Sequence, residues 1–123
     1  MKKEELMYGN KLLFLNEVVT FSNISQIRED GIFWIKTIEP KIDSKSFHFK
    51  PIPLTEEWLL KFGFFKYNNA YVLEKPSENI MNFKFSIWND FTYNSSEFPV
   101  ELKYVHQLQN LHFALTGTHL KLK

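Results

Sequence analysis

Short runs in which hydrophobic and polar residues alternate fill the first half of the chain, and this period is typical of half-buried β-strands. The turn-forming segments Asn16-Glu17 and Glu29-Asp30-Gly31 separate the runs. We therefore expect short strands at Lys11–Leu15, Val18–Ile24, Gly31–Thr37 and Ser46–Lys50, after one helical turn at Lys2–Met7. Four short strands within about 50 residues predict a small curled antiparallel sheet or an SH3-like barrel.

The second half of the chain combines helical and strand patterns. Thr55 is a good N-cap, Glu56 and Glu57 suit the positive end of a helix, and Gly63 ends that short helix. Further antiparallel strands are expected at Phe64–Tyr67, Ala70–Glu74, Met81–Ile87 and Phe91–Tyr93, and a C-terminal helix after Pro99. This order predicts an α+β fold with the last helix packed on the sheet. We expect one domain over residues 1–123, with a β-rich, SH3-like half at 1–53 and the helices and hairpins at 54–123.

The segment Tyr104–Gly117, with sequence YVHQLQNLHFALTG, predicts a helix with two unlike faces. One stripe contains Tyr104, Leu108, Leu111 and Leu115, with Val105 and His112 on its flank. The opposite face contains His106, Gln109, Asn110 and Phe113. We expect the leucine stripe to be the core seam of the protein. An aromatic ring among amides and an imidazole then either seals a dimer or lines a ligand pocket.

Composition narrows the classes of function. Aromatic residues make up 17% of the chain, so we expect some rings at a surface, an interface or a ligand site. The net charge is +1 and Arg28 is the single arginine, which argues against binding to long duplex nucleic acid. The lack of cysteine fits a reducing cytoplasm, and no apolar run reaches the roughly 18 residues that span a bilayer. We expect a cytoplasmic homo-oligomer with no membrane partner.

The sequence contains no recognisable catalytic or metal-binding motif. It has no GxSxG run, no P-loop and no dinucleotide fingerprint. His106, His112 and His119 lack the i, i+4 spacing of a helical metal site. We therefore predict no catalytic residue, no metal, no cofactor and no enzymatic activity. Carboxylate pairs that folding brings together are invisible in such a pattern.

Several segments place aromatic rings beside hydrogen-bonding groups, among them Phe33-Trp34, Phe47–Lys50 and Trp88–Phe91. A base stacked on such a ring gains ~1–3 kcal/mol, and lysines and amides can then contact phosphate and base edges. The alternative is that both faces of the sheet are buried, one of them in a dimer interface. The predicted ligand contacts are Phe113, His106, Gln109, Asn110, Trp34, Trp88 and Lys50.

Two stretches, PIPLTEEWLLKFGF (Pro51–Phe64) and KYVHQLQNLHFALTG (Lys103–Gly117), resemble the hallmark segments of an uncharacterised protein family. That family comprises small proteins from Bacteroidetes genomes and from their phages and mobile elements. The opening MKKEELMYGN is similar to the usual start of that family, a short charged stretch before a Gly-Asn turn. The resemblance brings no known activity. It implies a bacterial or phage cytoplasm and an accessory gene.

Together these features favour a non-enzymatic protein, encoded by a phage or mobile element, that sequesters a small nucleotide-type signalling molecule of host anti-phage defence. A protein–protein interaction module that inhibits a host protein is the main alternative, with the Phe113 face as its hot spot. A nucleic-acid accessory protein is less favoured because arginine is scarce. A nucleotide hydrolase is less favoured because no catalytic motif is present.

Overall fold

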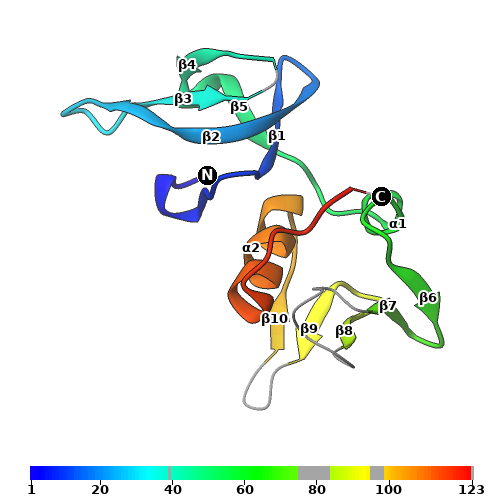
Figure 1. The fold of residues 1–123 in the computed structure, drawn as a ribbon. Coiled ribbons are helices and arrows are strands. Elements are labelled where there is room, and N and C mark those ends of the chain that lie inside the picture. Colours follow the sequence, from blue (N-terminus) through cyan, green and yellow to red (C-terminus); the bar gives the residue numbers. More distant parts are fainter. Residues whose placement is uncertain (39, 75–83, 95–98, 123) are drawn as a thin grey trace. The chain divides into compact units, whose positions relative to one another are not determined.

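The protein has an α+β fold with antiparallel sheets, which confirms the predicted fold class (Figure 1). The computed structural model describes residues 1–38, 40–74, 84–94 and 99–122. The chain divides into two compact units, Met1–Ile52 and Pro53–Lys123. The predicted boundary between the two halves, after residue 53, therefore lies next to the observed boundary.

The N-terminal unit is built on one antiparallel sheet with the strand order β4-β3-β2-β1-β5. Its strands are β1 (Lys11–Phe14), β2 (Glu17–Ile27), β3 (Phe33–Thr37), β4 (Asp43–Lys45) and β5 (Phe49–Pro51). The expected helical turn is the 3-10 segment η1 (Lys3–Glu5). Strands β1 to β4 follow one another across the sheet, and β5 returns to pair with β1 (Figure 1). In the described residues β4 and β5 remain the two edges, so the sheet is curled and open rather than a closed barrel.

The turn between β1 and β2 consists of Leu15 and Asn16, one residue earlier than the sequence predicts. Phe14 pairs directly with Glu17, and Leu15 and Asn16 have φ values of 49° and 67°. Two successive positive φ values define a type I′ turn, whose twist matches that of the flanking strands. Asn16 suits such a conformation, whereas Leu15 is tolerated there with its side chain 76% exposed.

The core of the N-terminal unit comes from alternate residues of the central strands. Its buried members are Leu12, Val19, Phe21, Phe33, Ile35 and Phe49. Leu6, Phe14, Ile24 and Ile42 pack against them at the edge of the cluster. This alternation is the pattern on which the strand predictions rest, so the predicted strands and the observed core agree.

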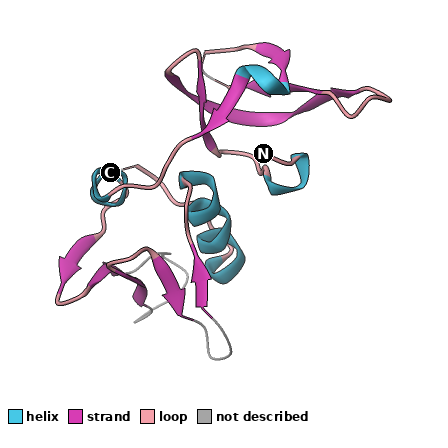
Figure 2. Ribbon diagram, turned by 180° about the vertical axis from the view of Figure 1, so that it is seen from behind, coloured by secondary structure: helices cyan, strands magenta, loops and turns pink. Residues whose placement is uncertain are grey.

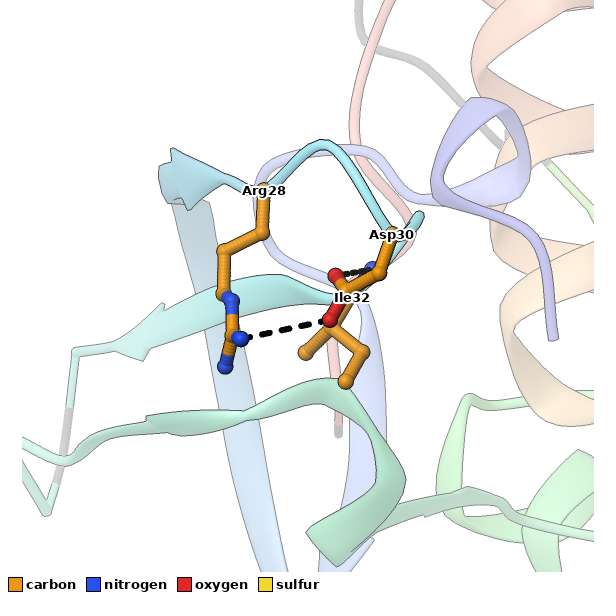
Figure 3. Close-up of polar contacts among 3 residues, drawn as sticks. All are labelled: Arg28, Asp30 and Ile32. Atoms are coloured by element: carbon orange, nitrogen blue, oxygen red, sulfur yellow. Dashed lines mark hydrogen bonds and ion pairs between the residues drawn. The ribbon is translucent and has the colours of Figure 1, made fainter.

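The turn between β2 and β3 is closed by polar contacts of Asp30 (Figure 3). One carboxylate oxygen lies 3.2 Å from the Arg28 guanidinium, and the other accepts a hydrogen bond of 3.1 Å from the Ile32 N–H. Gly31 has φ +87°, which favours glycine, so it belongs to the turn and not to the predicted strand. Arg28, the single arginine, is thus part of a structural turn.

The fourth predicted strand, Ser46–Lys50, is corrected by the structure. Residues Ser46–His48 form a 3-10 turn, η2, and the strand β5 begins only at Phe49. The strand β4 before this turn was not predicted. The turn breaks the alternation that would place Phe47 and Phe49 on one face, because Phe47 is 61% exposed whereas Phe49 is buried.

The C-terminal unit combines helices with small antiparallel sheets (Figure 2). Its elements are α1 (Glu56–Lys61), β6 (Phe65–Tyr67), β7 (Ala70–Glu74), β8 (Lys84–Trp88), β9 (Thr92–Asn94), β10 (Pro99–Glu101) and α2 (Val105–Thr116). The β6–β7 hairpin with its Asn68-Asn69 turn is confirmed. Pro99 begins the unpredicted strand β10, which pairs with β9 before the last helix. The start of the predicted Met81–Ile87 strand and the loop at Pro76–Asn79 lie outside the described residues.

Helix α1 begins and ends as the sequence predicts. The Thr55 hydroxyl accepts a hydrogen bond from the Trp58 N–H at 3.4 Å, and Gly63 follows the helix with φ +96°. Leu59 and Phe62 are buried, and the Trp58 ring lies 5.8 Å from that of Phe62. The N-cap, the terminating glycine and the apolar face therefore all agree with the local sequence.

Phe85 of β8 is the centre of the aromatic core in the C-terminal unit. Its side chain is 1% exposed, and its ring lies 5.9 Å from the Phe64 ring and 5.5 Å from the Tyr93 ring. The His112 ring of α2 contacts it edge-on at 5.7 Å. Since Phe85 belongs to the β6-β7-β8 sheet, this contact confirms that the C-terminal helix packs on a sheet.

The buried face of α2 differs from the predicted leucine stripe. Its buried residues are Val105, His106, Leu108, Gln109 and His112, whereas Leu115 is 40% exposed. Burial of His112 is compatible with its polarity, because its Nδ1–H donates to the Thr118 carbonyl at 3.0 Å. The predicted helix and its Gly117 C-cap, with φ +75°, are confirmed. The buried face is rotated about the helix axis from the predicted stripe, by about one residue position.

Tyr71 gives the C-terminal unit a pH dependence at high pH. Burial of the phenol is the largest cause that raises the pKa of Tyr71 above its ordinary value. The 3.1 Å hydrogen bond to Glu56 and the negative charge of Glu56 raise this pKa further. Because the pKa of Tyr71 is raised in the folded state, the contribution of Tyr71 to the free energy of unfolding is fully present below about pH 10. It is lost as the pH rises through the folded-state pKa. We expect Tyr71→Phe to reduce the loss of melting temperature above about pH 10.

The control for this measurement is Tyr67→Phe, because the Tyr67 side chain is 63% exposed. Burial lowers the pKa of Lys11, which changes the stability in the opposite direction below about pH 10.5, but Lys11 is unchanged in both variants. A Tyr71→Phe protein that loses melting temperature as steeply as the wild type above pH 10 would contradict the prediction.

Candidate functional site

A pocket of about 480 Å³ lies in the N-terminal unit. Its volume is in the range of sites for small organic ligands. Three segments of the unit form its wall, namely the turn before β1, the middle of β2, and the end of β3 with the loop to β4. The lining residues are Tyr8, Ser22, Asn23, Lys36, Thr37, Ile38, Lys41, Ile42 and Asp43.

Tyr8 is held at the pocket by a tight turn. The Asn10 N–H donates to the Met7 carbonyl at 3.0 Å, and the buried Asn10 side chain accepts from the Met7 N–H at 2.7 Å. Gly9 has φ +91°, as the third residue of a type II turn requires. The turn is fixed to β2 because the Gly9 N–H donates to the Phe21 carbonyl at 2.9 Å. Tyr8, 58% exposed, is therefore an aromatic ring on a rigid support.

The β2 wall of the pocket contains a β-bulge. Phe21 pairs with Thr37 and Asn23 pairs with Lys36, which leaves Ser22 as the extra residue on β2. A bulge redirects neighbouring side chains, and bulges are common beside functional sites. Here it brings a hydroxyl and an amide, those of Ser22 and Asn23, to the same pocket.

The third wall is tied together by Thr37. Its backbone N–H donates to the Ile42 carbonyl at 2.9 Å, and its hydroxyl accepts from the Ile42 N–H at 3.0 Å. The same hydroxyl donates to the Pro40 carbonyl. On the other side, the Ile38 N–H donates to the Thr20 carbonyl at 2.9 Å. The bonds between Thr37 and Ile42 hold Lys41 near the end of β3, where Lys36 lies.

The charged residues of the pocket are two lysines and one aspartate. Lys36 and Lys41 are exposed, and within the described part of the chain neither ammonium group forms an ion pair. Asp43 lies directly across from Lys36 in the β3–β4 ladder, and its Oδ1 accepts a 2.8 Å hydrogen bond from the Ser25 hydroxyl. The described lining is thus net positive, so it attracts anions while retaining one acceptor carboxylate.

The residues predicted from sequence as ligand contacts do not line this pocket. In the N-terminal unit, Trp34 of β3 is half-buried beneath Lys45, whose ammonium lies 5.9 Å from the ring centre. Lys50 is exposed on β5. In the C-terminal unit, Trp88 is 48% exposed at the end of β8.

The α2 face that was predicted to bind ligand is partly interior. His106 is 1% exposed and Gln109 is 7% exposed, which corrects the expectation that both face away from the core. The His106 ring stacks on Tyr104 with the centroids 5.8 Å apart. Phe113 is half-buried and stacks on His119 at 4.7 Å, and Asn110 on the same helix is half-buried too. The helix therefore uses most of this face for packing.

Metal sites and membrane spans are not evident in the described residues. Among the residues that the structure describes, we find no group of three or more His, Asp or Glu side chains that could hold a metal ion. Among the same residues, we find no helix with the length and apolar character needed to cross a bilayer. Comparisons with protein-family models, with curated proteins and with solved structures found no match to this chain. The pocket is therefore interpreted from its own chemistry.

Sequence reasoning missed the pocket because its walls are distant in sequence. Two local signals could have indicated it. Tyr8 precedes a Gly-Asn turn, and Lys36 and Lys41 flank a short Pro-containing loop. Neither signal shows that the turn and the loop lie on the same side of β2, since that depends on the strand register.

Proposed function

We propose that the protein is a non-enzymatic binding protein for a small nucleotide-type ligand, and that the pocket at Tyr8, Lys36 and Lys41 holds this ligand. The supporting observation is the combination of one aromatic ring, two lysines without ion pairs among the described residues, and several hydrogen-bonding groups in about 480 Å³. An aromatic ring stacks on any base, and lysines neutralise phosphate. The Asn23 amide and the Ser22 hydroxyl supply donors and acceptors for base or sugar.

The biological role that we propose is sequestration of a nucleotide signal used in host anti-phage defence. Its support is the resemblance of Pro51–Phe64 and Lys103–Gly117 to a family found in Bacteroidetes genomes, phages and mobile elements. A protein in that setting would act in the bacterial cytoplasm as a homo-oligomer. Its binding would remove the signal without changing it chemically.

Calorimetric titration tests the binding. Wild-type protein is titrated with cyclic dinucleotides and with cyclic ADP-ribose isomers, and we expect at least one of them to bind. Tyr8→Ala should weaken that binding by roughly tenfold or more, because stacking on an aromatic ring is worth ~1–3 kcal/mol per base. Tyr67→Ala is the matched control, since Tyr67 is similarly exposed at 63% but lies in the other unit. Flat titrations with all these ligands would refute the proposal.

Recovery of the ligand separates sequestration from hydrolysis. A complex is formed, separated from free ligand and denatured, and the released molecule is measured by mass spectrometry. Sequestration predicts that its mass is unchanged after prolonged incubation. Conversion of the ligand during incubation would instead identify a nucleotide hydrolase. Native mass spectrometry of the complex before it is denatured reports the oligomeric state.

A protein–protein interaction module is the second candidate function, and one exposed aromatic surface favours it. Phe47 is 61% exposed on η2, and the Lys45 ammonium lies 5.8 Å from its ring centre and 5.9 Å from that of Trp34. Aromatic residues are enriched at protein interfaces relative to the rest of a protein surface. Affinity purification from a bacterial lysate should then recover a stoichiometric partner that Phe47→Ala fails to recover.

A further inference from the structure

We propose that Asp43 makes the pocket selective for a guanine base, an inference that rests on the proposed nucleotide-binding function. Asp43 is the acidic residue among the described residues of the lining. A carboxylate is an unfavourable group to place in a pocket for a phosphate-bearing ligand, because it repels the phosphates. Asp43 accepts a hydrogen bond from Ser25 and lies across from Lys36 in the ladder, and its carboxylate keeps acceptor capacity for a part of the ligand that donates hydrogen bonds.

The carboxylate of Asp43 is oriented by the protein before any ligand arrives. Asp43 is the first residue of β4, and the Ser25 hydroxyl of β2 donates to its Oδ1 at 2.8 Å. An ionised carboxylate has about four acceptor positions, so one bond from Ser25 leaves capacity on both oxygens. The group can therefore accept two parallel hydrogen bonds from a ligand without a large loss of side-chain entropy.

The edges of the nucleobases differ in how well they match such an acceptor. Guanine presents two neighbouring donors, the ring N1–H and the exocyclic amino group. Adenine and cytosine present an unprotonated ring nitrogen beside their amino group, and this lone pair repels a carboxylate. Uracil presents a single N–H between two carbonyl oxygens. A carboxylate accepts only, so it makes two good hydrogen bonds with guanine alone.

The remaining groups of the pocket fit the other parts of a guanine nucleotide. Tyr8 is the aromatic residue of the described lining, and Lys36 and Lys41 offer positive charge for the phosphates. The two lysines outnumber the one acid in the described lining, so the net attraction for the anionic ligand is retained. Selectivity and affinity are thereby assigned to different side chains.

The test compares GMP, IMP, AMP and 2′-deoxy-GMP in calorimetric titrations of the full chain. IMP lacks only the exocyclic amino group of guanine. We expect wild-type protein to bind GMP at least about tenfold more tightly than AMP, with IMP between them, because a site built for a donor rejects ligands without it. Asp43→Asn should reduce the preference for GMP over AMP to about threefold or less, since an amide is both donor and acceptor.

Two controls accompany the test. Glu17→Gln removes an exposed carboxylate from the same unit outside the pocket and should leave the GMP-to-AMP ratio unchanged. In the Asp43→Asn variant the new amide oxygen can still accept from the Ser25 hydroxyl, and the melting temperature of the variant shows whether the fold is intact. The ratio of GMP to IMP binding in the wild type needs no variant at all.

The outcomes separate this inference from the proposed function. Equal binding of GMP and AMP, with 2′-deoxy-GMP weaker than GMP in the wild type but not in Asp43→Asn, would assign the carboxylate to the sugar and overturn the guanine selectivity. The proposed nucleotide-binding function would stand in that case. Failure of every nucleotide, cyclic or linear, to bind wild-type protein would overturn both.

Discussion

Replacement of both Lys36 and Lys41 by glutamine is expected to weaken nucleotide binding by about 100-fold. In the proposed complex each lysine would form a charge-assisted contact with phosphate, and about 1.4 kcal/mol for each contact corresponds to a tenfold change in affinity. Both side chains are exposed, so the fold should be unaffected. Calorimetric titration measures the change, and the melting temperature of the variant verifies that it is folded.

The control for the lysine variant is the double replacement Lys50→Gln and Lys66→Gln. It removes the same net charge from exposed positions that do not line the pocket. Wild-type affinity should also fall as salt rises, whereas the affinity of the Lys36/Lys41 variant should depend less on salt, because screening acts on the removed charges. Equal losses in the two double variants would show that overall charge, not the pocket, governs binding.

Phe85→Ala is expected to reduce the free energy of unfolding by about 3–5 kcal/mol, the usual loss for a buried phenylalanine. Phe85 is 1% exposed, and its ring contacts Phe64, Tyr93 and His112 from three elements of the C-terminal unit. Truncation leaves a cavity that these aromatic rings cannot fill without moving. Urea unfolding followed by circular dichroism measures the change.

Phe65→Ala is the matched control for the Phe85 variant, because Phe65 is the same type of residue on β6 but is 42% exposed. We expect it to lose less than about 1 kcal/mol. A Phe85→Ala protein that unfolds at the same urea concentration as Phe65→Ala would show that the aromatic cluster contributes little to stability.

Elements whose signals are local were predicted well from the sequence. Helix α1 begins at the Thr55 side-chain cap and ends before Gly63, a glycine with positive φ. Both signals depend on a few neighbouring residues. Gly117 ends α2 in the same way. The Asn68-Asn69 turn of the β6–β7 hairpin is equally local, since a two-residue turn fixes the register of both strands.

The short segments near strand edges were predicted less well. Ser46–His48 alternates like a strand but forms a 3-10 turn, and the three-residue strands β4 and β10 have too few residues for a periodic signal. Whether such a segment pairs depends on the strand already beside it. Asp43 joins the sheet because β3 offers it an edge, and the sequence of β4 alone does not contain that information.

Tertiary packing decided which residues of α2 are buried. The leucine stripe is the more hydrophobic side, yet His112 and Gln109 are buried and Leu115 is 40% exposed. Burial of His112 is stabilised by its bond to the Thr118 carbonyl and by the ring of Phe85, two partners that hydrophobicity does not predict. The ligand face predicted from the pattern was therefore largely a packing face.

By itself the sequence determined the fold class and the two helices with their ends. These depend on periodicity, on caps and on turn residues, which act over a few positions. The tertiary structure alone decided the pocket, because Tyr8, Lys36 and Asp43 meet only after β2 has paired with β3 across the Ser22 bulge. Strand register couples distant residues, and a shift of one residue would turn the lining side chains of the shifted strand to the other face.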